Sequence, residues 1–430
     1  MKRLVLFVCF GLLIVTSCKK NNTIASGKSE RLTWELNKDS TLTISGKWSM
    51  LDYSDTNYSP WPKTIKTVVI KNGVTSIGSS AFAECNRLIS ISIPNSVKKI
   101  RPHAFYGCSS LMSIDVENGN TEYSSINGVL FNKAQTGLQL YPAGKIGAYT
   151  IPNSVTNIGE RAFSRCFGLT TITIPNSVIN IDFGAFEECI SLTSINIPNS
   201  VTYIADLAFL NCISLTSAVV GNSVTTIGIE AFRNCISLKS IYVRNAVTYI
   251  GENAFEGCSS LTSINIPNSV IYIGMGVLKG CTSLTSVTIG NSVKNIGDEA
   301  FSGCSSLIAI TIPNSVTSIG YGVFAGCTSL TTVNIPNSVI SISNLAFLGC
   351  TSLTSITIPN SVTNIEHGAF ADCTSLTEII NESATPQAID SSVFFYVSKS
   401  ACTLRVPAAS LDAYRAAPVW KDFGNIVAIQ

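Results

Sequence analysis

The cysteine positions constrain the fold of this chain more than any other feature of its sequence. Twelve of them form two runs with a constant spacing of 23 residues: Cys85, Cys108, then Cys166, Cys189, Cys212, Cys235, Cys258, Cys281, Cys304, Cys327, Cys350 and Cys373. The gap between the two runs is 58 residues, which is one 23-residue unit plus 35 residues. A fixed period of this size is typical of a solenoid, in which stacked units bury a common core. We therefore predict twelve repeat units.

One unit, residues 282–304 (TSLTSVTIGNSVKNIGDEAFSGC), shows the local pattern. Apolar and polar residues alternate over residues 286–289, which predicts a strand with one buried side. In most units a proline then precedes Asn-Ser, and proline ends a strand because it lacks the N–H that a ladder needs. Residues 293–296 predict a second short extended piece. A glycine corner and an Ala-Phe turn lead from there to the cysteine.

The pattern L-T-S-I-x-I-P-N-S-V-x-x-I-G-x-x-A-F-x-x-C repeats over about residues 64–380 and resembles the leucine-rich repeats of BspA-type bacterial surface proteins. The resemblance implies a right-handed leucine-rich-repeat superhelix. It also implies a parallel β-sheet on the concave face, with short helical or irregular segments on the convex side.

The two ends of the array need caps, because a solenoid end exposes apolar surface and an unpaired strand edge. Residues 31–63 resemble the N-terminal β cap of the same family, and residues 381–430 resemble its C-terminal cap. In the latter, Ser410 is predicted to cap a short helix. Tyr414, Trp420 and Phe423 are predicted to cover the last repeat.

The extra residues between the two cysteine runs lie at about 117–150. Asn127-Gly128 stands between two apolar runs there, which predicts an inserted hairpin. The hairpin is interpreted either as a recognition element or as a tolerated insertion of the kind that solenoids place in loops.

The first 17 residues have the pattern of a signal peptide: two basic residues precede an apolar run over residues 4–15, too short to span a bilayer. Residues 15–18, Val-Thr-Ser-Cys, resemble a bacterial lipobox, which implies that Cys18 becomes the lipidated N-terminus and holds the chain in a membrane. An ordinary secretory signal is the alternative. Residues 18–30 are polar and predict a flexible tether. No transmembrane helix is predicted.

These features together predict a bacterial outer membrane lipoprotein at the cell surface. Residues 19–22 (KKNN) lack the acidic residues that follow the lipidated cysteine in some surface-exported lipoproteins. A periplasmic orientation therefore stays open.

Composition and motifs exclude several function classes. Lys and Arg number 28 and Asp and Glu 26, so the net charge is +2, and this near-balance argues against a nucleic-acid binder. His103 and His367 lie too many turns apart to meet in a solenoid. The chain has no C-x-x-C pair and no known nucleophile or phosphate-loop motif. We predict no enzyme activity, no metal site and no cofactor, and we interpret the cysteine column as buried free thiols.

The remaining candidate site consists of two outward-facing columns. The first lies between the two strand isoleucines of successive units and includes Thr173, Asn196, Tyr242, Asn265 and Thr288. The second lies in the V-x-x-I piece and includes Tyr203, Tyr249 and Tyr272. Tyrosine, threonine and asparagine form a flat, uncharged surface able to hydrogen-bond, and tyrosines are common binding anchors. The alternative is that Thr and Tyr occur here only because they favour strands.

The family resemblance implies a non-enzymatic binding protein of the cell envelope. It would be an adhesin for host extracellular or mucosal proteins or for other bacteria. Two alternatives stay open. One is glycan capture, in which the three tyrosines would stack on sugars, and the other is a structural spacer that has no ligand.

Overall fold

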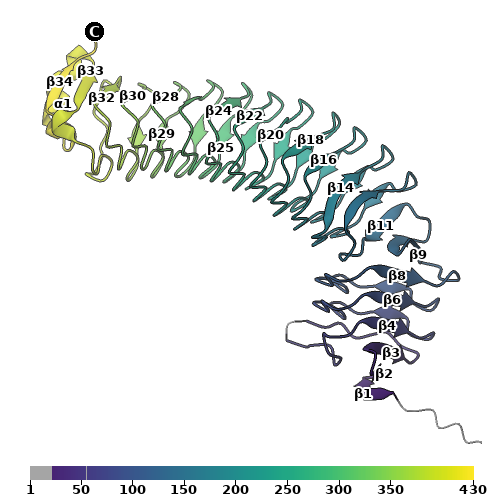
Figure 1. Cartoon of the computed structure of the whole chain (residues 1–430). Helices are drawn as coiled ribbons and strands as arrows, with labels where there is room; N and C mark the ends of the chain where they lie inside the picture. The colour runs from purple at the N-terminus through teal and green to yellow at the C-terminus, as the bar shows by residue number, and fades with distance from the viewer. Residues whose placement is uncertain (1–21, 55) are drawn as a thin grey trace, which may run out of the picture.

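A computed structural model describes residues 22–54 and 56–430, which form one curved parallel β-solenoid of about 17 turns with little helix (Figure 1). The predicted solenoid is thus confirmed. The alternating S-I-x-I piece of each turn forms a strand of the longer ladder. These strands are β4 (Thr67–Ile70), β6 (Ser90–Ile93), β8 (Ser113–Val116), β12 (Gly147–Thr150), β14 (Leu169–Thr173), β16 (Ser194–Asn196), β18 (Ser217–Val219), β20 (Ser240–Ile241), β22 (Ser263–Ile266), β24 (Ser286–Ile289), β26 (Ala309–Thr311), β28 (Thr332–Asn334), β30 (Ser355–Ile358) and β32 (Glu378–Asn381).

The V-x-x-I piece forms a second ladder, also as predicted. Its strands have only two residues each, and we call it the shorter ladder. Its strands are β5 (Ser76–Ile77), β7 (Lys99–Ile100), β13 (Asn157–Ile158), β15 (Asn180–Ile181), β17 (Tyr203–Ile204), β19 (Thr226–Ile227), β21 (Tyr249–Ile250), β23 (Tyr272–Ile273), β25 (Asn295–Ile296), β27 (Ser318–Ile319), β29 (Ser341–Ile342) and β31 (Asn364–Ile365). Pairing is parallel and in register, so equivalent residues of successive turns lie side by side, as Ser194 and Ser217 do.

The third side of each turn is the Ala-Phe segment, the stretch from the corner residue to the cysteine, such as residues 182–189. Three of its N–H groups donate to the next turn: those of Gly184, Phe186 and Glu188 bond to carbonyls at distances of 3.0, 2.8 and 2.7 Å. The first and third of these residues have φ of 58° and 56°. This left-handed backbone aligns the donors toward the next turn.

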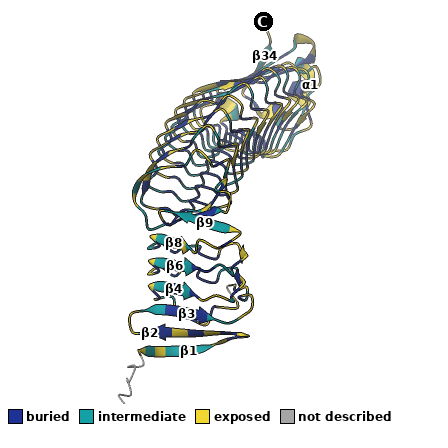
Figure 2. Ribbon diagram, turned by 90° about the vertical axis from the view of Figure 1, so that its right-hand side faces the viewer, coloured by how far each residue is buried: buried dark blue, intermediate teal, exposed yellow. Residues whose placement is uncertain are grey.

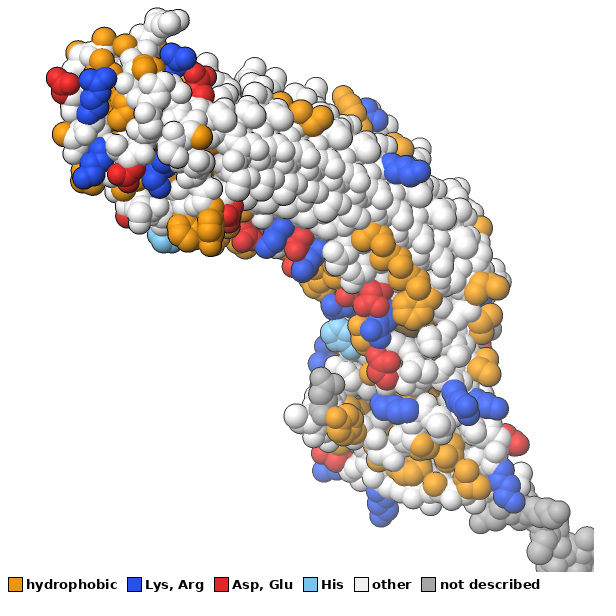
Figure 3. All heavy atoms as spheres, turned by 60° about the vertical axis from the view of Figure 1, so that its left-hand side comes forward, with side chains coloured by type: hydrophobic (Ala, Val, Ile, Leu, Met, Phe, Trp, Pro, Cys, Tyr) orange, Lys and Arg blue, Asp and Glu red, His pale blue; other side chains and the backbone are white. Residues whose placement is uncertain are grey.

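The curvature differs from the expectation in one respect. Figure 3 shows both histidine side chains and a row of charged side chains along the inner side of the bend. Both histidines belong to Ala-Phe segments, so these segments, and not the predicted sheet, line the concave side. A solenoid bends toward the side on which its turns approach most closely. The Ala-Phe segment combines three inter-turn bonds per turn with small Ala, Gly and Cys residues.

The core runs through the inside of the turns as several columns of equivalent apolar residues, one of which is a phenylalanine column; Figure 2 marks the buried positions in dark blue. Phenylalanine rings stack on one another, for example Phe186 on Phe209 with 5.2 Å between centroids. The column is interrupted at Leu278, as the sequence indicates, and a second time at the insertion, where no ring pair joins Phe105 to Tyr141. The buried side chains correspondingly form two clusters, one from Leu32 to Leu130 and one from Val129 to Phe423.

The N-terminal cap contains three strands. Strands β2 (Leu32–Asn37) and β3 (Thr41–Ser45) precede the array, and β3 pairs with β4 in parallel. The predicted tether over residues 18–30 is wrong for residues 23–29, because these form β1 (Thr23–Ser29), which pairs antiparallel with β2. The backbone of β1 covers the otherwise unpaired edge of β2, a contact that needs no apolar side chains. Cys18 lies outside the described residues.

The insertion is a small antiparallel unit. Strands β9 (Tyr123–Ile126) and β10 (Val129–Asn132) form the predicted hairpin, with φ of 50° at Asn127 and 78° at Gly128. Strand β11 (Gly137–Leu140) then pairs antiparallel with β10 and parallel with β13. The chain therefore returns to the array through β11, and in this turn the Ala-Phe segment is missing.

The C-terminal region first extends the longer ladder by two strands and then covers its end. Strands β33 (Thr403–Val406) and β34 (Asn425–Ala428) add in parallel to β32, and helix α1 (Leu411–Ala416) lies between them. Short 3₁₀ turns span Lys399–Ala401, Ala408–Ser410 and Trp420–Asp422. Ser410 precedes the helix, but its hydroxyl donates to the Ala384 carbonyl, so the predicted cap bond is not made. The predicted covering aromatics, Tyr414, Trp420 and Phe423, are buried.

Candidate functional site

The first predicted column lies on the longer ladder, one residue per turn. The strand register places Thr173, Asn196, Val219, Tyr242, Asn265 and Thr288 at the same position of successive turns. All are exposed except Asn265, which is half-buried. The guanidinium of Arg244 packs over the ring of Tyr242 at 4.6 Å. A shallow hollow of about 290 Å³ opens beside Asn196 and Val219.

The second predicted column lies on the shorter ladder. Tyr249 and Tyr272 are in neighbouring turns, and Thr226 separates Tyr203 from Tyr249. Burial raises the pKa of Tyr203 and of Tyr272, and nearby carboxylates raise both further. The two columns belong to different sheets, so the structure does not bring the eight predicted residues together in one site.

The eight predicted side chains share one property: none has a hydrogen-bond partner among the described residues. Their neighbours differ. The hydroxyls of Thr193, Thr225 and Thr248 each donate to a carbonyl of the preceding turn. Those threonines serve the stack, whereas the polar groups of the two columns are free to bind another molecule.

A pocket of about 230 Å³ at the insertion was not predicted from the sequence. Its lining includes Phe105 and Tyr141 from the two sides of the ring-column break, together with His103, Arg161 and Ser164. The cysteine gap marked the insertion. The sequence does carry a signal for the pocket, because no Ala-Phe pair precedes Tyr141. The prediction from the sequence did not use this signal.

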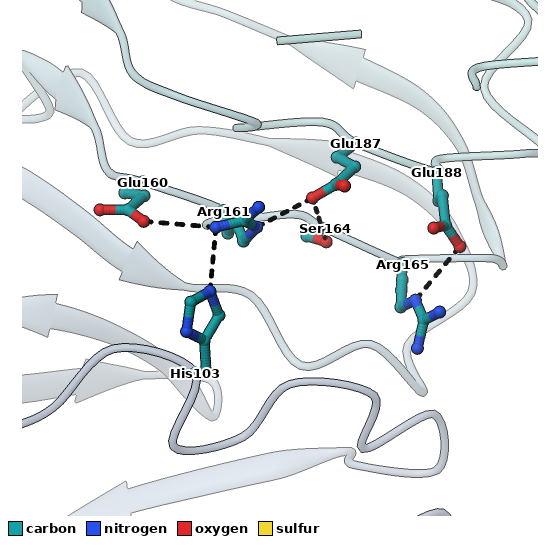
Figure 4. Close-up of polar contacts among 7 residues, drawn as sticks. All are labelled: His103, Glu160, Arg161, Ser164, Arg165, Glu187 and Glu188. Carbon is teal, nitrogen blue, oxygen red and sulfur yellow. Dashed lines mark hydrogen bonds and ion pairs between the residues drawn. The ribbon is translucent and has the colours of Figure 1, made fainter. Parts of the chain in front are cut away.

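Arg161 lines this pocket, and Arg165 follows it in the same Ala-Phe segment (Figure 4). Arg161 lies 2.9 Å from the ring nitrogen Nε2 of His103, and its Nε donates to Glu187 at 2.9 Å. Arg165 extends over the ring of Tyr106, with 4.5 Å to the centroid, and pairs with a carboxylate on each side. These are Glu84 at 2.8 Å and Glu188 at 3.1 Å. Glu160 also approaches Arg161, so carboxylates balance both arginines.

The cysteines are free thiols, as predicted. All thirteen described cysteines are buried and unpaired. Every column member except Cys85 bonds to a main-chain carbonyl, as Cys212 Sγ does to the Phe186 carbonyl at 3.1 Å. Burial raises the pKa of Cys212 and of Cys258 to about 12. Among residues 22–54 and 56–430, no three His, Cys, Asp or Glu side chains are placed to hold a metal ion. No helix in that part of the chain is long and apolar enough to cross a membrane.

Comparison with known proteins agrees with this architecture. A family model described as BspA type leucine rich repeat region matches residues 61–136, 139–262, 248–377 and 294–411. A leucine-rich repeat protein from Bacteroides ovatus is 24% identical, with a TM-score of 0.50 and coverage of 94% of this chain and 100% of that chain. A leucine rich cell surface protein from Faecalibacterium prausnitzii is also 24% identical, with a TM-score of 0.44 and coverage of 94% and 95%. No curated protein matches.

The Bacteroides ovatus structure shows the fold that this chain shares. Leucine-rich repeat proteins are typically non-enzymatic and generally bind other proteins. The family model covers most of the residues from the first repeat to the C-terminal ladder. This protein therefore belongs to the family of BspA-type leucine-rich repeat proteins.

Proposed function

We propose that this protein is a non-enzymatic adhesin, anchored in the bacterial envelope through Cys18, that binds a host extracellular or mucosal protein or another bacterial surface. The observation that carries the proposal is the set of eight side chains on the two columns, none of which has a hydrogen bond within the described residues. They lie on a scaffold whose turns are fixed by backbone bonds on three sides. Preformed polar groups on a rigid frame bind with little loss of conformational entropy.

Contacts with a partner would be weak individually and numerous. One column residue recurs with every turn, at the roughly 4.8 Å spacing of parallel strands. A partner that lies along the array therefore meets several of them at once. Many copies on one cell raise the overall strength of attachment without any new contact.

The long-ladder column is tested with the triple variant Asn196→Ala, Tyr242→Ala and Thr288→Ala. The matched control is Tyr58→Ala, Tyr321→Ala and Tyr396→Ala, three exposed tyrosines outside the columns. Both variants and the parent protein are assayed on immobilised host matrix proteins and mucins. We expect the column variant to lose about tenfold or more in affinity, the sum of three contacts of about 0.5 kcal/mol each. Equal binding by the column variant, or equal loss in the control, contradicts the proposal.

The neutrality of the columns adds a second readout of the same assay. The one charged group noted against the first column is the guanidinium of Arg244, which packs over Tyr242. Raising the salt concentration to about 0.5 M should therefore change the affinity little, because screening acts on charges. Abolished binding at that salt concentration would contradict a neutral contact surface.

Glycan capture is the second candidate, and the tyrosine column favours it. Tyr203, Tyr249 and Tyr272 are 40%, 42% and 41% exposed, so each has open surface that a sugar can contact. Glycan arrays with the parent protein and with the variant that changes all three to Ala decide this. Sugar binding that disappears in the variant supports capture, and a blank array for the parent protein contradicts it.

The envelope location is tested by protease treatment of intact cells, followed by immunoblotting for the repeats. Digestion while the outer membrane is intact agrees with an adhesin. Digestion only after lysis places the array in the periplasm and contradicts the adhesin. A Cys18→Ala variant, which is expected to leave the membrane fraction, tests the anchor separately.

A further inference from the structure

The ladder of Ala-Phe segments is interrupted at the insertion, and this leaves backbone donors without acceptors. In the turn before the break, Ser80, Phe82 and Glu84 donate their N–H groups to the next turn at 3.4, 2.8 and 2.7 Å. The equivalent residues 23 positions later are His103, Phe105 and Gly107. Among the described residues, no acceptor faces any of these three N–H groups. They form the first edge of a slot.

The opposite edge lacks donors. In regular turns the carbonyls of Phe183, Ala185 and Glu187 accept bonds from the preceding turn. The equivalent carbonyls one turn earlier belong to Glu160, Ala162 and Ser164. Only that of Ala162 is used, by the N–H of Tyr141 at 2.7 Å. Two carbonyls therefore face the slot without a backbone donor.

The space between the edges is the pocket at the insertion, and it lacks one ring of the core column. Phe82 stacks on Phe105 at 5.7 Å, and Tyr141 stacks on Phe163 at 5.0 Å, but Phe105 and Tyr141 do not stack on each other. Phe105 is 7% exposed, whereas the other phenylalanines of the column are 0% exposed. The pocket thus has an apolar floor of rings and two polar backbone edges.

The electrostatics of the slot disfavour an anion. Arg101 and Arg161 are the cations that line the pocket, and Arg165 lies beside Arg161 in the same segment. Carboxylates pair with all three: Asp52 with Arg101, Glu160 and Glu187 with Arg161, and Glu84 and Glu188 with Arg165. The free carbonyls of the second edge would repel a negative group. A row of N–H donors facing a row of carbonyl acceptors instead matches a polypeptide backbone, which carries both kinds of group in alternation.

We propose that this slot binds a short, uncharged polypeptide segment of a partner protein in place of the missing Ala-Phe segment. The carbonyls of the bound segment accept from His103, Phe105 and Gly107. Its N–H groups donate to the carbonyls of Glu160 and Ser164. A phenylalanine or similar apolar side chain fills the gap between Phe105 and Tyr141. This site does not depend on the two outer columns, and either can fail without the other.

The array itself supplies a suitable probe. Residues 320–326, Gly-Tyr-Gly-Val-Phe-Ala-Gly, form an uncharged Ala-Phe segment, and glycine occupies both left-handed positions, with φ of 55° at Gly322 and 72° at Gly326. A synthetic peptide of this sequence can adopt the required backbone without strain. The control peptide has serine in place of the phenylalanine.

Hydrogen exchange of the full chain, read by mass spectrometry, tests the slot directly. In the free protein, we expect the amides of residues 103–107 to exchange at least tenfold faster than the matched amides of residues 80–84. The peptide should slow residues 103–107 to the rate of residues 80–84, and the serine peptide should do so at least tenfold more weakly. Slow exchange of residues 103–107 without peptide, or no protection at about 1 mM peptide, overturns the proposal. Protection that grows with protein concentration alone also overturns it, because a second copy would then occupy the slot.

A blocking variant provides an independent check. Ala143 lines the pocket, and Ala143→Phe places a ring inside it. We expect this variant to lose protection by the peptide and to retain the slow exchange of residues 80–84, which shows that it is folded. Undiminished protection in a folded variant overturns the proposal. If the variant does not fold, the comparison of the two peptides on the parent protein still decides.

Discussion

Single phenylalanines of the core column hold neighbouring turns together. Phe232 is fully buried, with ring centroids 5.0 Å from Phe209 and 5.7 Å from Phe255. Phe232→Ala leaves a cavity between two rings and should lower the free energy of unfolding by about 3–5 kcal/mol. Urea unfolding followed by circular dichroism measures this. The control is Ile236→Ala, where the side chain is 44% exposed and the expected change is below about 0.5 kcal/mol. An unchanged unfolding midpoint for Phe232→Ala contradicts the prediction.

The buried thiols predict a loss of stability at alkaline pH. Burial raises the pKa of Cys212 and Cys258 to about 12 in the folded chain, above the ordinary value of 9.0. Below pH 9 the thiols are neutral in both states and their contribution to stability is fully present. As the pH rises from 9 toward 12, only the unfolded chain ionises, so stability falls by about 1.4 kcal/mol per pH unit for each thiol.

Melting curves at pH values from 7 to above 10 measure this effect. The double variant Cys212→Ala and Cys258→Ala should show a shallower alkaline decline than the parent protein, because two ionising groups are missing from its unfolded state. The neutral-pH stability of each protein serves as its own reference. Parallel declines in the two proteins contradict the assignment to thiols.

At the scale of elements, the C-terminal cap depends on Trp420. This side chain is fully buried, its Nε1–H donates to the Gln387 carbonyl at 2.9 Å, and its ring packs edge-on against Phe394 at 5.5 Å. Trp420→Ala should cost about 3–5 kcal/mol and speed hydrogen exchange chiefly in strands β32 to β34. Phe395→Ala is the control, because that side chain is 53% exposed. Faster exchange spread evenly over the array would contradict a local capping role.

The sequence predicted the elements that depend on local pattern and missed those that depend on a neighbour. Strand β24 follows from the alternation of residues 286–289, and the hairpin follows from the Asn127-Gly128 turn. Strand β1 was missed because its only large apolar side chain, Ile24, is 58% exposed, and the strand is held by the backbone of β2. The direction of the bend was missed because it depends on how successive turns pack against each other, which no single residue encodes.

The candidate site divides in the same way. The period-2 pattern correctly indicated that Thr173, Tyr242 and Thr288 face outward. It could not indicate which exposed hydroxyls are already bonded, because the bond of the Thr225 hydroxyl is made to a carbonyl of the preceding turn. The slot at the insertion arises from donors that lose their partner when one turn lacks an Ala-Phe segment. The sequence pattern of one unit does not show whether the adjacent turn lacks a segment.

For the whole molecule, the two buried clusters predict two unfolding steps. In a solenoid, cooperativity passes only between adjacent turns. At the insertion three inter-turn donors and one ring contact are missing, so the coupling is weakest between the Phe105 and Phe163 turns. The N-terminal cluster, from Leu32 to Leu130, is smaller than the C-terminal one. We expect it to unfold at a lower urea concentration, because a smaller core buries less apolar surface.

The tryptophans allow the two steps to be separated. The chain has four, and Trp34, Trp48 and Trp61 lie in the N-terminal part. In a Trp420→Phe background, fluorescence therefore reports only that part, whereas circular dichroism reports mainly the longer C-terminal part. Adding Phe82→Ala should shift the fluorescence transition alone, and adding Phe324→Ala should shift the circular dichroism transition alone. If both substitutions move both signals equally, the turns on the two sides of the insertion unfold as one unit, and the interrupted ladder does not separate them.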